Sequence, residues 1–357
     1  MARKGAKNAE KIQTNRFNRC VFAPLREICF TFTPMKKLLI ADDYLEGILR
    51  GDTVTLARAI TLIESNAAEH LPLASELLLK CIPYAGKSIR VGISGVPGVG
   101  KSSFIEALGK ILTAKGKKVA VLAIDPSSGR SKGSILGDKT RMEMLSADKN
   151  AFIRPSPTSG TWGGVALKTR ETIVLCEAAG YELIFVETVG VGQSEISVSS
   201  MVDFFLLFVL AGAGDELQGI KKGIMEMADA IAVTKADGDN VKPAIKAKAE
   251  YINALHLLSP SASGWIPKVT SCSSQTGEGV KEVWKIIEHY VAFTKENQWF
   301  EKNRVRQNLY WMHETVNEEL KRRFYAEPKI QEKIKNLEQE VKEGRVSSFE
   351  AAKRLLQ

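Results

Sequence analysis

The sequence predicts an α/β fold in which a mostly parallel sheet is covered by helices on both faces. Between residues 89 and 295, short apolar segments alternate with segments of helical spacing, which is typical of parallel strands connected by helices. The first apolar segment, residues 89–94, leads directly into the sequence GVPGVGKS at 95–102. A strand, a loop of this form and a helix in succession predict a P-loop NTPase, because such a loop folds its backbone N–H groups around phosphates.

Each element is expected where its apolar pattern is continuous. Strands are expected as short apolar runs at residues 89–94, 118–124, 151–154, 183–187, 203–210, 230–234 and 268–271. Long helices are expected at residues 102–114, 163–179, 241–258 and 279–294, where apolar side chains recur every three or four positions. The P-loop domain therefore spans residues 89–297.

Helical segments flank this domain on both sides. Residues 38–88 are predicted to form a helical N-terminal extension, in which Asp52 caps one helix and residues 69–80 form another. Residues 298–357 are predicted to form a charged C-terminal helical arm. Its apolar stripe consists of Val305, Leu309, Met312, Val316 and Leu320. Such a stripe packs on the helix's own domain or forms a dimer contact, and both interpretations remain open.

The net charge of +9 is concentrated at the N-terminus of the chain. Residues 1–38 hold nine Lys or Arg against two acids, so the rest of the chain is nearly neutral. A basic nucleic-acid groove on the folded domain is therefore not expected. The leader, residues 1–37, is expected to be disordered, with an organelle-targeting segment or translated sequence upstream of a start at Met35 as alternatives.

The composition also bears on membrane insertion, on the redox compartment and on metal binding. No run of 18 or more apolar residues occurs, so no membrane span is expected. The five cysteines are scattered without a C-x-x-C pair, which favours a reducing compartment. This compartment is the cytoplasm, or the mitochondrial matrix if the leader is a targeting segment. The four histidines show no metal-ligand spacing.

The phosphate loop supplies the first candidate ligands. Lys101 is expected to reach the β- and γ-phosphates, and the Ser102 hydroxyl to coordinate Mg²⁺. The N-terminus of the following helix adds partial positive charge. The residues expected to surround the phosphates are Gly95, Pro97, Gly98, Val99, Gly100, Lys101, Ser102 and Ser103.

Acidic residues after the next strands complete the expected magnesium site. Asp125 follows the strand at 118–124, Asp138 lies in the loop beyond it, and Glu187 ends the strand at 183–187. Parallel strands end at one edge of the sheet, where open α/β sheets bind ligands. An apolar strand that ends in an acid is the Walker B arrangement, and Gly190 is placed for its backbone N–H to sense the γ-phosphate.

The sequence TKAD at residues 234–237 predicts guanine as the base. The Asp237 carboxylate would accept from N1–H and the exocyclic amino group of guanine, whereas adenine would leave it unpaired at a cost of about 1–3 kcal/mol. The residues expected to hold the base are Thr234, Lys235 and Asp237, with Cys272, Ser273 and Ser274 from the loop after the next strand. GTP is therefore favoured over ATP.

The sequence shows no obvious residue that would position the attacking water for hydrolysis. Ras-like enzymes orient the attacking water with a Gln that follows the switch glycine, but here Val191 follows Gly190, and the nearest Gln is Gln193. We therefore expect slow intrinsic turnover that needs a partner or a conformational change.

With these motifs, the chain resembles the MeaB/ArgK/MMAA family of P-loop GTPases, which are chaperones of adenosylcobalamin-dependent methylmalonyl-CoA mutase. The likeness covers roughly residues 38–325. Besides the phosphate loop, it rests on GD at 51–52, LARAIT at 56–61, DPSS at 125–128, SILGDKTRM at 134–142, ETVGVGQSE at 187–195 and GDELQGIK at 214–221.

The resemblance implies several roles. It implies Mg²⁺ bound around Ser102 with the three acids nearby. It also implies a mobile loop with Gln218 and Lys221 that swings toward the nucleotide when the mutase binds, so that Lys221 stabilises transition-state charge. The implied catalytic residues are Lys101, Lys221 and Gln218. The implied assembly is a homodimer whose partner is a B12-dependent acyl-CoA mutase, with no nucleic acid and no membrane.

One residue departs from the family pattern. Thr234 stands where the family usually has Asn, which predicts a weaker tether between the base loop and the phosphate loop.

Two other functions remain as alternatives. A small-molecule transport-associated kinase would use the same fold but would yield a phosphorylated product. A metal-insertion GTPase would need a Cys/His cluster, which the sequence lacks.

Overall fold

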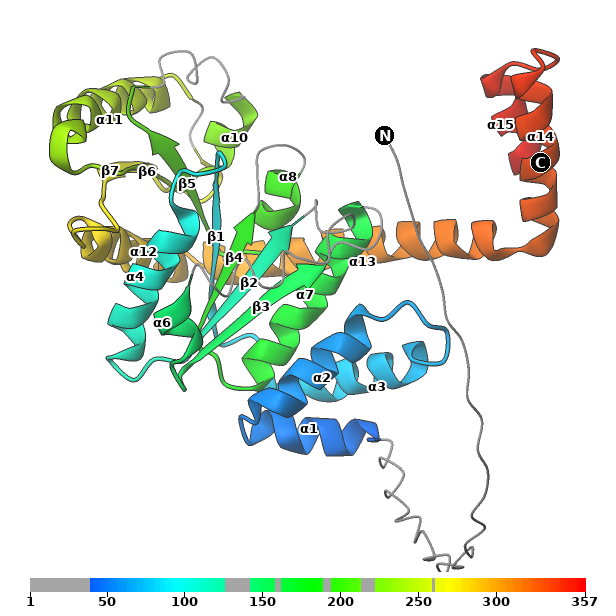
Figure 1. The fold of residues 1–357 in the computed structure, drawn as a ribbon, viewed down its shortest axis with the longest axis horizontal. Helices are drawn as coiled ribbons and strands as arrows, with labels where there is room; N and C mark the ends of the chain where they lie inside the picture. Colours follow the sequence, from blue (N-terminus) through cyan, green and yellow to red (C-terminus); the bar gives the residue numbers. More distant parts are fainter. Residues whose placement is uncertain (1–38, 126–141, 158–161, 189–193, 213–221, 259–260) are drawn as a thin grey trace, which may run out of the picture. The chain divides into compact units, whose positions relative to one another are not determined.

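The computed structural model describes residues 39–125, 142–157, 162–188, 194–212, 222–258 and 261–357. All described residues belong to one compact unit, Leu39–Gln357. The predicted α/β fold is confirmed: seven parallel strands form one sheet in the order β3-β2-β4-β1-β5-β6-β7 (Figure 1).

All seven predicted strands are present. They are β1 (Ile89–Gly95), β2 (Val119–Asp125), β3 (Ala151–Pro157), β4 (Leu183–Thr188), β5 (Phe204–Leu210), β6 (Ala230–Thr234) and β7 (Lys268–Ser271). The largest difference is at β3, which continues past the predicted end at residue 154. Pro155 and Pro157 lack a backbone N–H, but β3 is the edge of the sheet and pairs only with β2, where proline is tolerated.

Helices cover both faces of the sheet, as predicted. One face packs against α4 (Lys101–Thr113), α6 (Glu143–Ser146) and α12 (Val280–Glu296). The other face packs against α7 (Trp162–Ala178), α8 (Ser194–Ser199) and α11 (Val241–His256). Further helices pack on α7 or α8: α1 (Ala41–Leu49), α2 (Thr53–Glu64), α3 (Leu71–Cys81), α10 (Lys222–Met227) and part of α13 (Trp299–Ala326). Short 3-10 turns occur at η1 (Ile82–Tyr84) and η2 (Gly238–Asn240).

The N-terminal extension is helical, and its predicted cap is present. The carboxylate of Asp52 accepts hydrogen bonds from the backbone N–H groups of Val54 at 3.0 Å and Thr55 at 3.3 Å, so it satisfies two donors at the start of α2. The first helix begins at Ala41, and the third ends at Cys81.

The C-terminal helices extend beyond the sheet. α13 leads into α14 (Pro328–Lys342) and α15 (Ser348–Leu356), which lie at the end of α13 remote from the sheet and pack on each other (Figure 1). The five residues of the apolar stripe are between 50% and 61% exposed, so this stripe does not pack on its own domain. The side of α13 that docks is a different one, with Phe300, Gln307 and Trp311 buried. No helix in the described part of the chain is long and apolar enough to span a membrane.

A buried ion pair joins the central strand to α7. The guanidinium of Arg90 on β1 donates two hydrogen bonds of 2.9 Å to the carboxylate of Glu177, which also accepts from Ser88 Oγ at 2.6 Å and Gly86 N at 2.7 Å. Burial raises the pKa of Glu177, but the Arg90 charge and these hydrogen bonds lower it by more, so the net pKa is below its ordinary value. The carboxylate is therefore ionised in the folded protein and contributes to its stability.

Replacing this carboxylate should destabilise the fold in a pH-dependent way. We expect Glu177→Gln to lower the free energy of unfolding by about 3 kcal/mol at pH 7, because Arg90 loses its buried partner. Because the pKa of Glu177 is lower in the folded than in the unfolded protein, its ionisation stabilises the fold fully at pH values above 4.5, the ordinary pKa of Glu. This contribution is lost as the pH falls through the pKa of the folded state. Thermal unfolding at pH 7 and below pH 4.5 should therefore show a smaller difference between variant and wild type in acid.

The matched control is Glu182→Gln, which removes an ion pair with Lys117 whose side chains are half exposed. It should change the melting temperature little at any pH. Equal effects of the two substitutions at pH 7 would contradict the assigned role of Glu177.

Candidate nucleotide-binding site

The phosphate loop connects β1 to α4 through backbone conformations that favour glycine. Gly98 and Gly100 have φ values of +77° and +106°, in the left-handed region. Gly95 has a φ of +149°, and a Cβ atom there would lie 2.5 Å from the carbonyl oxygen of Phe208 on β5. The loop therefore passes close to the neighbouring strand, and it ends at the N-terminus of α4, where helical N–H groups favour an anion.

Lys101 and Ser102 are the first two residues of α4. The ammonium group of Lys101 is buried and donates to the carbonyl oxygens of Gly95 at 2.7 Å and Val96 at 3.2 Å. The Ser102 hydroxyl donates to Oε1 of Glu187 at 2.8 Å. The phosphate loop and the acid at the end of β4 thus meet through this hydroxyl, as the sequence led us to expect.

The paired oxygens of Ser102 and Glu187 suit Mg²⁺, which prefers hydroxyl, carboxylate and phosphate oxygens. Asp125 is the last residue of β2, and Ile124 pairs with Thr188 of β4, so the backbone of Asp125 ends at the same edge of the sheet. Within the described ranges, no group of three or more His, Cys, Asp or Glu side chains could hold a metal ion. Mg²⁺ is usually bound through one or two carboxylates together with substrate phosphates and water.

Four predicted site residues lie outside the described residues. These are Asp138, Gly190, Gln218 and Lys221.

The base loop is tied to the phosphate loop by Thr234 at the end of β6. Its hydroxyl donates to the carbonyl oxygen of Val99 at 2.7 Å, and it lies 3.3 Å from the carbonyl oxygen of Val209. The Thr234 side chain therefore reaches the phosphate loop, and that its tether is weaker than one made by Asn stays a prediction. Lys235 follows with a φ of +55°, rare outside glycine, and its carbonyl accepts from Asn240 Nδ2 at 2.7 Å.

The loop after β7 fixes the acid that is expected to read the base. The buried Ser273 hydroxyl donates to Oδ2 of Asp237, and the backbone N–H of Ala236 donates to the carbonyl of Cys272 at 3.1 Å. Burial raises the pKa of the Cys272 thiol to about 12, so it is protonated at neutral pH and packs in the core. Cys272 thus supports the loop through its backbone, while Ser274 is half-buried beside it.

Sequence reasoning missed two buried hydroxyl residues beneath the site. Thr188 Oγ1 donates to Ser94 Oγ at 3.0 Å, and both residues are fully buried. This bond joins the carboxyl ends of β1 and β4, directly beside the phosphate loop and Glu187. In both cases the sequence shows a small polar residue near the end of an otherwise apolar strand, which could have indicated this bond.

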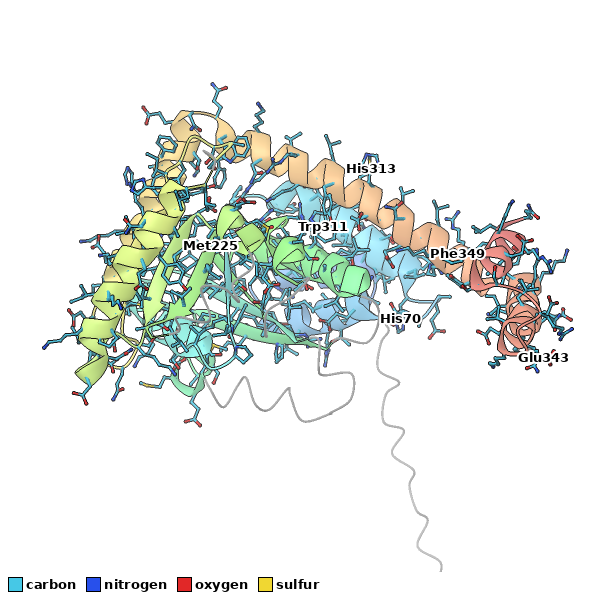
Figure 2. The ribbon with its side chains drawn as sticks, turned by 90° about the horizontal axis from the view of Figure 1, so that it is seen from above. His70, Met225, Trp311, His313, Glu343 and Phe349 are labelled. Carbon is cyan, nitrogen blue, oxygen red and sulfur yellow. The ribbon has the colours of Figure 1, made fainter. Side chains whose placement is uncertain are left out.

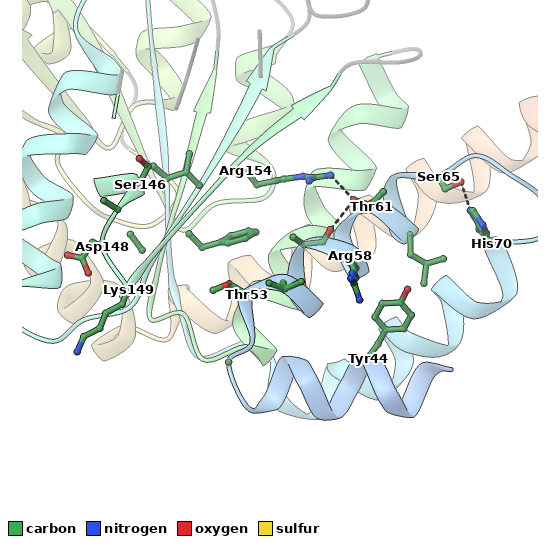
Figure 3. A pocket seen from close by; sticks show the side chains of 18 residues that line it. Tyr44, Thr53, Arg58, Thr61, Ser65, His70, Ser146, Asp148, Lys149 and Arg154 are labelled. Carbon is green, nitrogen blue, oxygen red and sulfur yellow. Dashed lines mark hydrogen bonds between the residues drawn. The ribbon is translucent and has the colours of Figure 1, made fainter. Parts of the chain in front are cut away.

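A separate cavity of about 1120 Å³ lies along the outer side of β3, between α2 and the segment 146–149 (Figure 3). Arg154 crosses part of it to contact Thr61 and to form an ion pair with Glu64. None of the predicted site residues that the structure describes lines this cavity, so it is distinct from the nucleotide site.

Comparison with known proteins identifies the family. The sequence profile described as "Methylmalonyl Co-A mutase-associated GTPase MeaB" matches residues 56–329. The chain belongs to the MeaB family.

Relatives of this MeaB-family chain are similar over most of their length. A "Putative GTPase" of Caulobacter vibrioides is 49% identical over 310 residues, covering 87% of this chain and 94% of its own. The "Methylmalonic aciduria type A homolog, mitochondrial" of Mus musculus is 44% identical, covering 94% and 83% respectively. A crystal structure named "LAO/AO transport system kinase" superposes with a TM-score of 0.70 at 36% identity, covering 88% of this chain and 96% of its own. The relatives named GTPases and the P-loop fold show that the MeaB-family chain is a GTPase.

The tether at Thr234 can be tested in this MeaB-family chain by removing its hydroxyl. We expect Thr234→Val to weaken GDP binding roughly tenfold, because the Val99 carbonyl loses its partner and the two loops lose their link. Isothermal titration calorimetry measures the effect. The control is Thr172→Val, a buried Thr of α7 whose hydroxyl bonds only within its own helix. Unchanged GDP affinity in Thr234→Val would contradict the role of the tether.

The base acid can be tested by changing what it accepts. In Asp237→Asn, the amide donates where the carboxylate accepted, so kcat/KM for GTP should fall by about 100-fold while kcat/KM for xanthosine triphosphate rises. Asp239→Asn, at an exposed acid two residues away, should leave both values unchanged. If both substitutions lower GTP turnover equally without a gain for xanthosine triphosphate, Asp237 does not read the base.

Proposed function

We propose that this chain is a GTP-driven chaperone that gates the loading of adenosylcobalamin into methylmalonyl-CoA mutase, or a related B12-dependent acyl-CoA mutase, and protects the loaded enzyme. The observation that carries the proposal is the match of the mutase-associated GTPase profile over residues 56–329. The relative named after methylmalonic aciduria type A, similar over 94% of this chain, supports the same reading.

The proposed cycle uses the residues of the nucleotide site. Lys101 turns its ammonium from loop carbonyls to phosphate oxygens, and Asp237 selects guanine. Ser102 and Glu187 hold Mg²⁺, with Asp125 and Asp138 nearby; when bound, the ion neutralises phosphate charge. Hydrolysis then shifts the population between two conformations of the protein, one favoured by GTP and one by GDP.

In this proposal, binding of the mutase completes the site for hydrolysis. We propose that Gln218 and Lys221 approach the nucleotide when the mutase binds, and that Lys221 stabilises charge in the transition state. Slow turnover in isolation suits a switch, because GTP then persists until the correct partner arrives.

We further propose a homodimer. Its support is the stripe on α13, whose five apolar side chains are half exposed or more and follow one another at helical spacing. As to location, we propose the cytoplasm, or the mitochondrial matrix if the leader acts as a targeting segment.

The decisive experiment measures GTP turnover by the purified chain with and without methylmalonyl-CoA mutase, with ATP as the control nucleotide. We expect the mutase to raise kcat at least tenfold for GTP alone. Lys221→Ala should abolish this stimulation and leave the basal rate unchanged; equal loss of both would rule out its proposed role. Turnover that ignores every B12-dependent acyl-CoA mutase would reject the chaperone function while leaving the GTPase intact.

A kinase is the second candidate, because the similar crystal structure carries that name. The same assay separates the two functions. A GTPase chaperone releases one phosphate for each GTP consumed, whereas a kinase transfers that phosphate to a second substrate.

A further inference from the structure

Side chains from α13 hold residues 199–202, the segment that runs from the last residue of α8 toward β5. Gln307 Nε2 donates to the carbonyl oxygen of Val202 at 2.7 Å, and it lies 3.5 Å from that of Ser199. Trp311 Nε1 donates to the carbonyl oxygen of Ser200 at 3.0 Å. Ser200 and Val202 follow the helix, and these side chains satisfy backbone carbonyls that would otherwise need water.

The same helix presses on the central strand. Val198 of α8 is fully buried, and a Cβ atom on Gly92 of β1 would lie 2.8 Å from its Cγ1 and 3.0 Å from Cγ2 of Val202. Gly95, where the phosphate loop begins, is three positions after Gly92 on the same strand. Because the side chains of Val198 and Val202 fill the space beside Gly92, they cannot shift toward the sheet without moving β1.

The base of α13 is anchored independently of α8. Arg304 donates to both carboxylate oxygens of Asp203 at 2.7 Å and to the carbonyl oxygens of Gly86 at 2.5 Å and Ser88 at 2.6 Å. Asp203 in turn accepts from the backbone N–H of Arg90 on β1 at 2.8 Å. The start of α13 is thus fixed to the sheet, and the next two turns of the helix contact residues 199–202.

One side of α13 is therefore internal and the other is open. Figure 2 shows Trp311 on the side that faces the domain and His313 on the opposite side, pointing away from it. Gln307 and Trp311 are 4% and 6% exposed, whereas the stripe residues Leu309 and Val316 are 54% and 50% exposed.

We propose that Gln307 and Trp311 are positioning residues for GTP hydrolysis. They hold the end of α8 and Val202 against Gly92 and so keep β1 and the phosphate loop in the geometry that hydrolysis requires. The role rests on the GTPase activity alone.

The test removes the two hydrogen bonds with little loss of volume, in Gln307→Leu combined with Trp311→Phe. Single-turnover GTP hydrolysis with excess protein should slow by about tenfold, the change that about 1.4 kcal/mol of activation free energy gives. The Kd for GDP should stay within about twofold, because a small shift of the phosphate loop leaves its donors within reach of the diphosphate, whereas hydrolysis depends more steeply on geometry. A purely structural role would not separate these two quantities.

The control variants change exposed groups elsewhere on α13. Asn317→Leu removes an exposed amide that bonds to Glu314 of the same helix, and Tyr310→Phe removes the hydroxyl of an exposed ring. Both should hydrolyse GTP at the wild-type rate. If the double variant does not fold, Gln307→Asn keeps the amide but shortens its reach, and we expect it to slow hydrolysis about threefold.

Two results would overturn the proposal. One is a lower melting temperature with an unchanged rate of hydrolysis, which would reduce the contact to fold stability. The other is a parallel loss of GDP affinity and rate, which would mean that the whole site is disordered by the change.

Discussion

The nucleotide site depends on two glycines of the central strand β1, Gly92 and Gly95, because neighbouring elements pack closely against both. At Gly92 the helix α8 approaches from one face, and at Gly95 the backbone of β5 lies within van der Waals distance of the missing Cβ. Larger residues would force apart elements that must converge at the end of the sheet. The phosphate loop can start from a fixed place because the strand before it is packed on several sides.

Hydrogen bonds between buried polar groups hold the neighbouring elements in place around β1. Arg90 and Glu177 bind β1 to α7, and the bond between Thr188 and Ser94 joins the carboxyl ends of β4 and β1. Each group is almost wholly buried, so losing a partner costs more than the bond contributes in water. Such pairs specify one register between neighbouring elements, which apolar packing alone leaves less strictly defined.

Local patterns allowed much of the fold to be predicted. The strands of a parallel sheet read as continuous apolar runs, and all seven were found in this way. The end of β3 was missed because Pro155 and Pro157 argue against a strand unless its edge position is known, and that position follows from the strand order. The phosphate loop, Ser102 and Glu187 were predictable because each stands at a fixed place relative to a strand end.

Contacts between distant parts of the chain could not be read in the same way. An apolar stripe on α13 is visible in the sequence, yet the helix docks through Gln307, Trp311 and Arg304, which do not belong to it. A polar side chain at a helical position reads as solvent-exposed unless its buried acceptor is known. The acceptors here are carbonyl and carboxylate oxygens more than a hundred residues away, and no spacing rule connects them.

This arrangement has a mechanical consequence for the arm. A helix of 28 residues, fixed at its base by Arg304, behaves as a rigid rod over its docked turns. Any tilt of the helix therefore changes the contacts of Gln307 and Trp311 on its docked side. Because Val202, the acceptor of Gln307, packs beside Gly92, these buried amide and indole groups connect α13 to the strand that carries the phosphate loop.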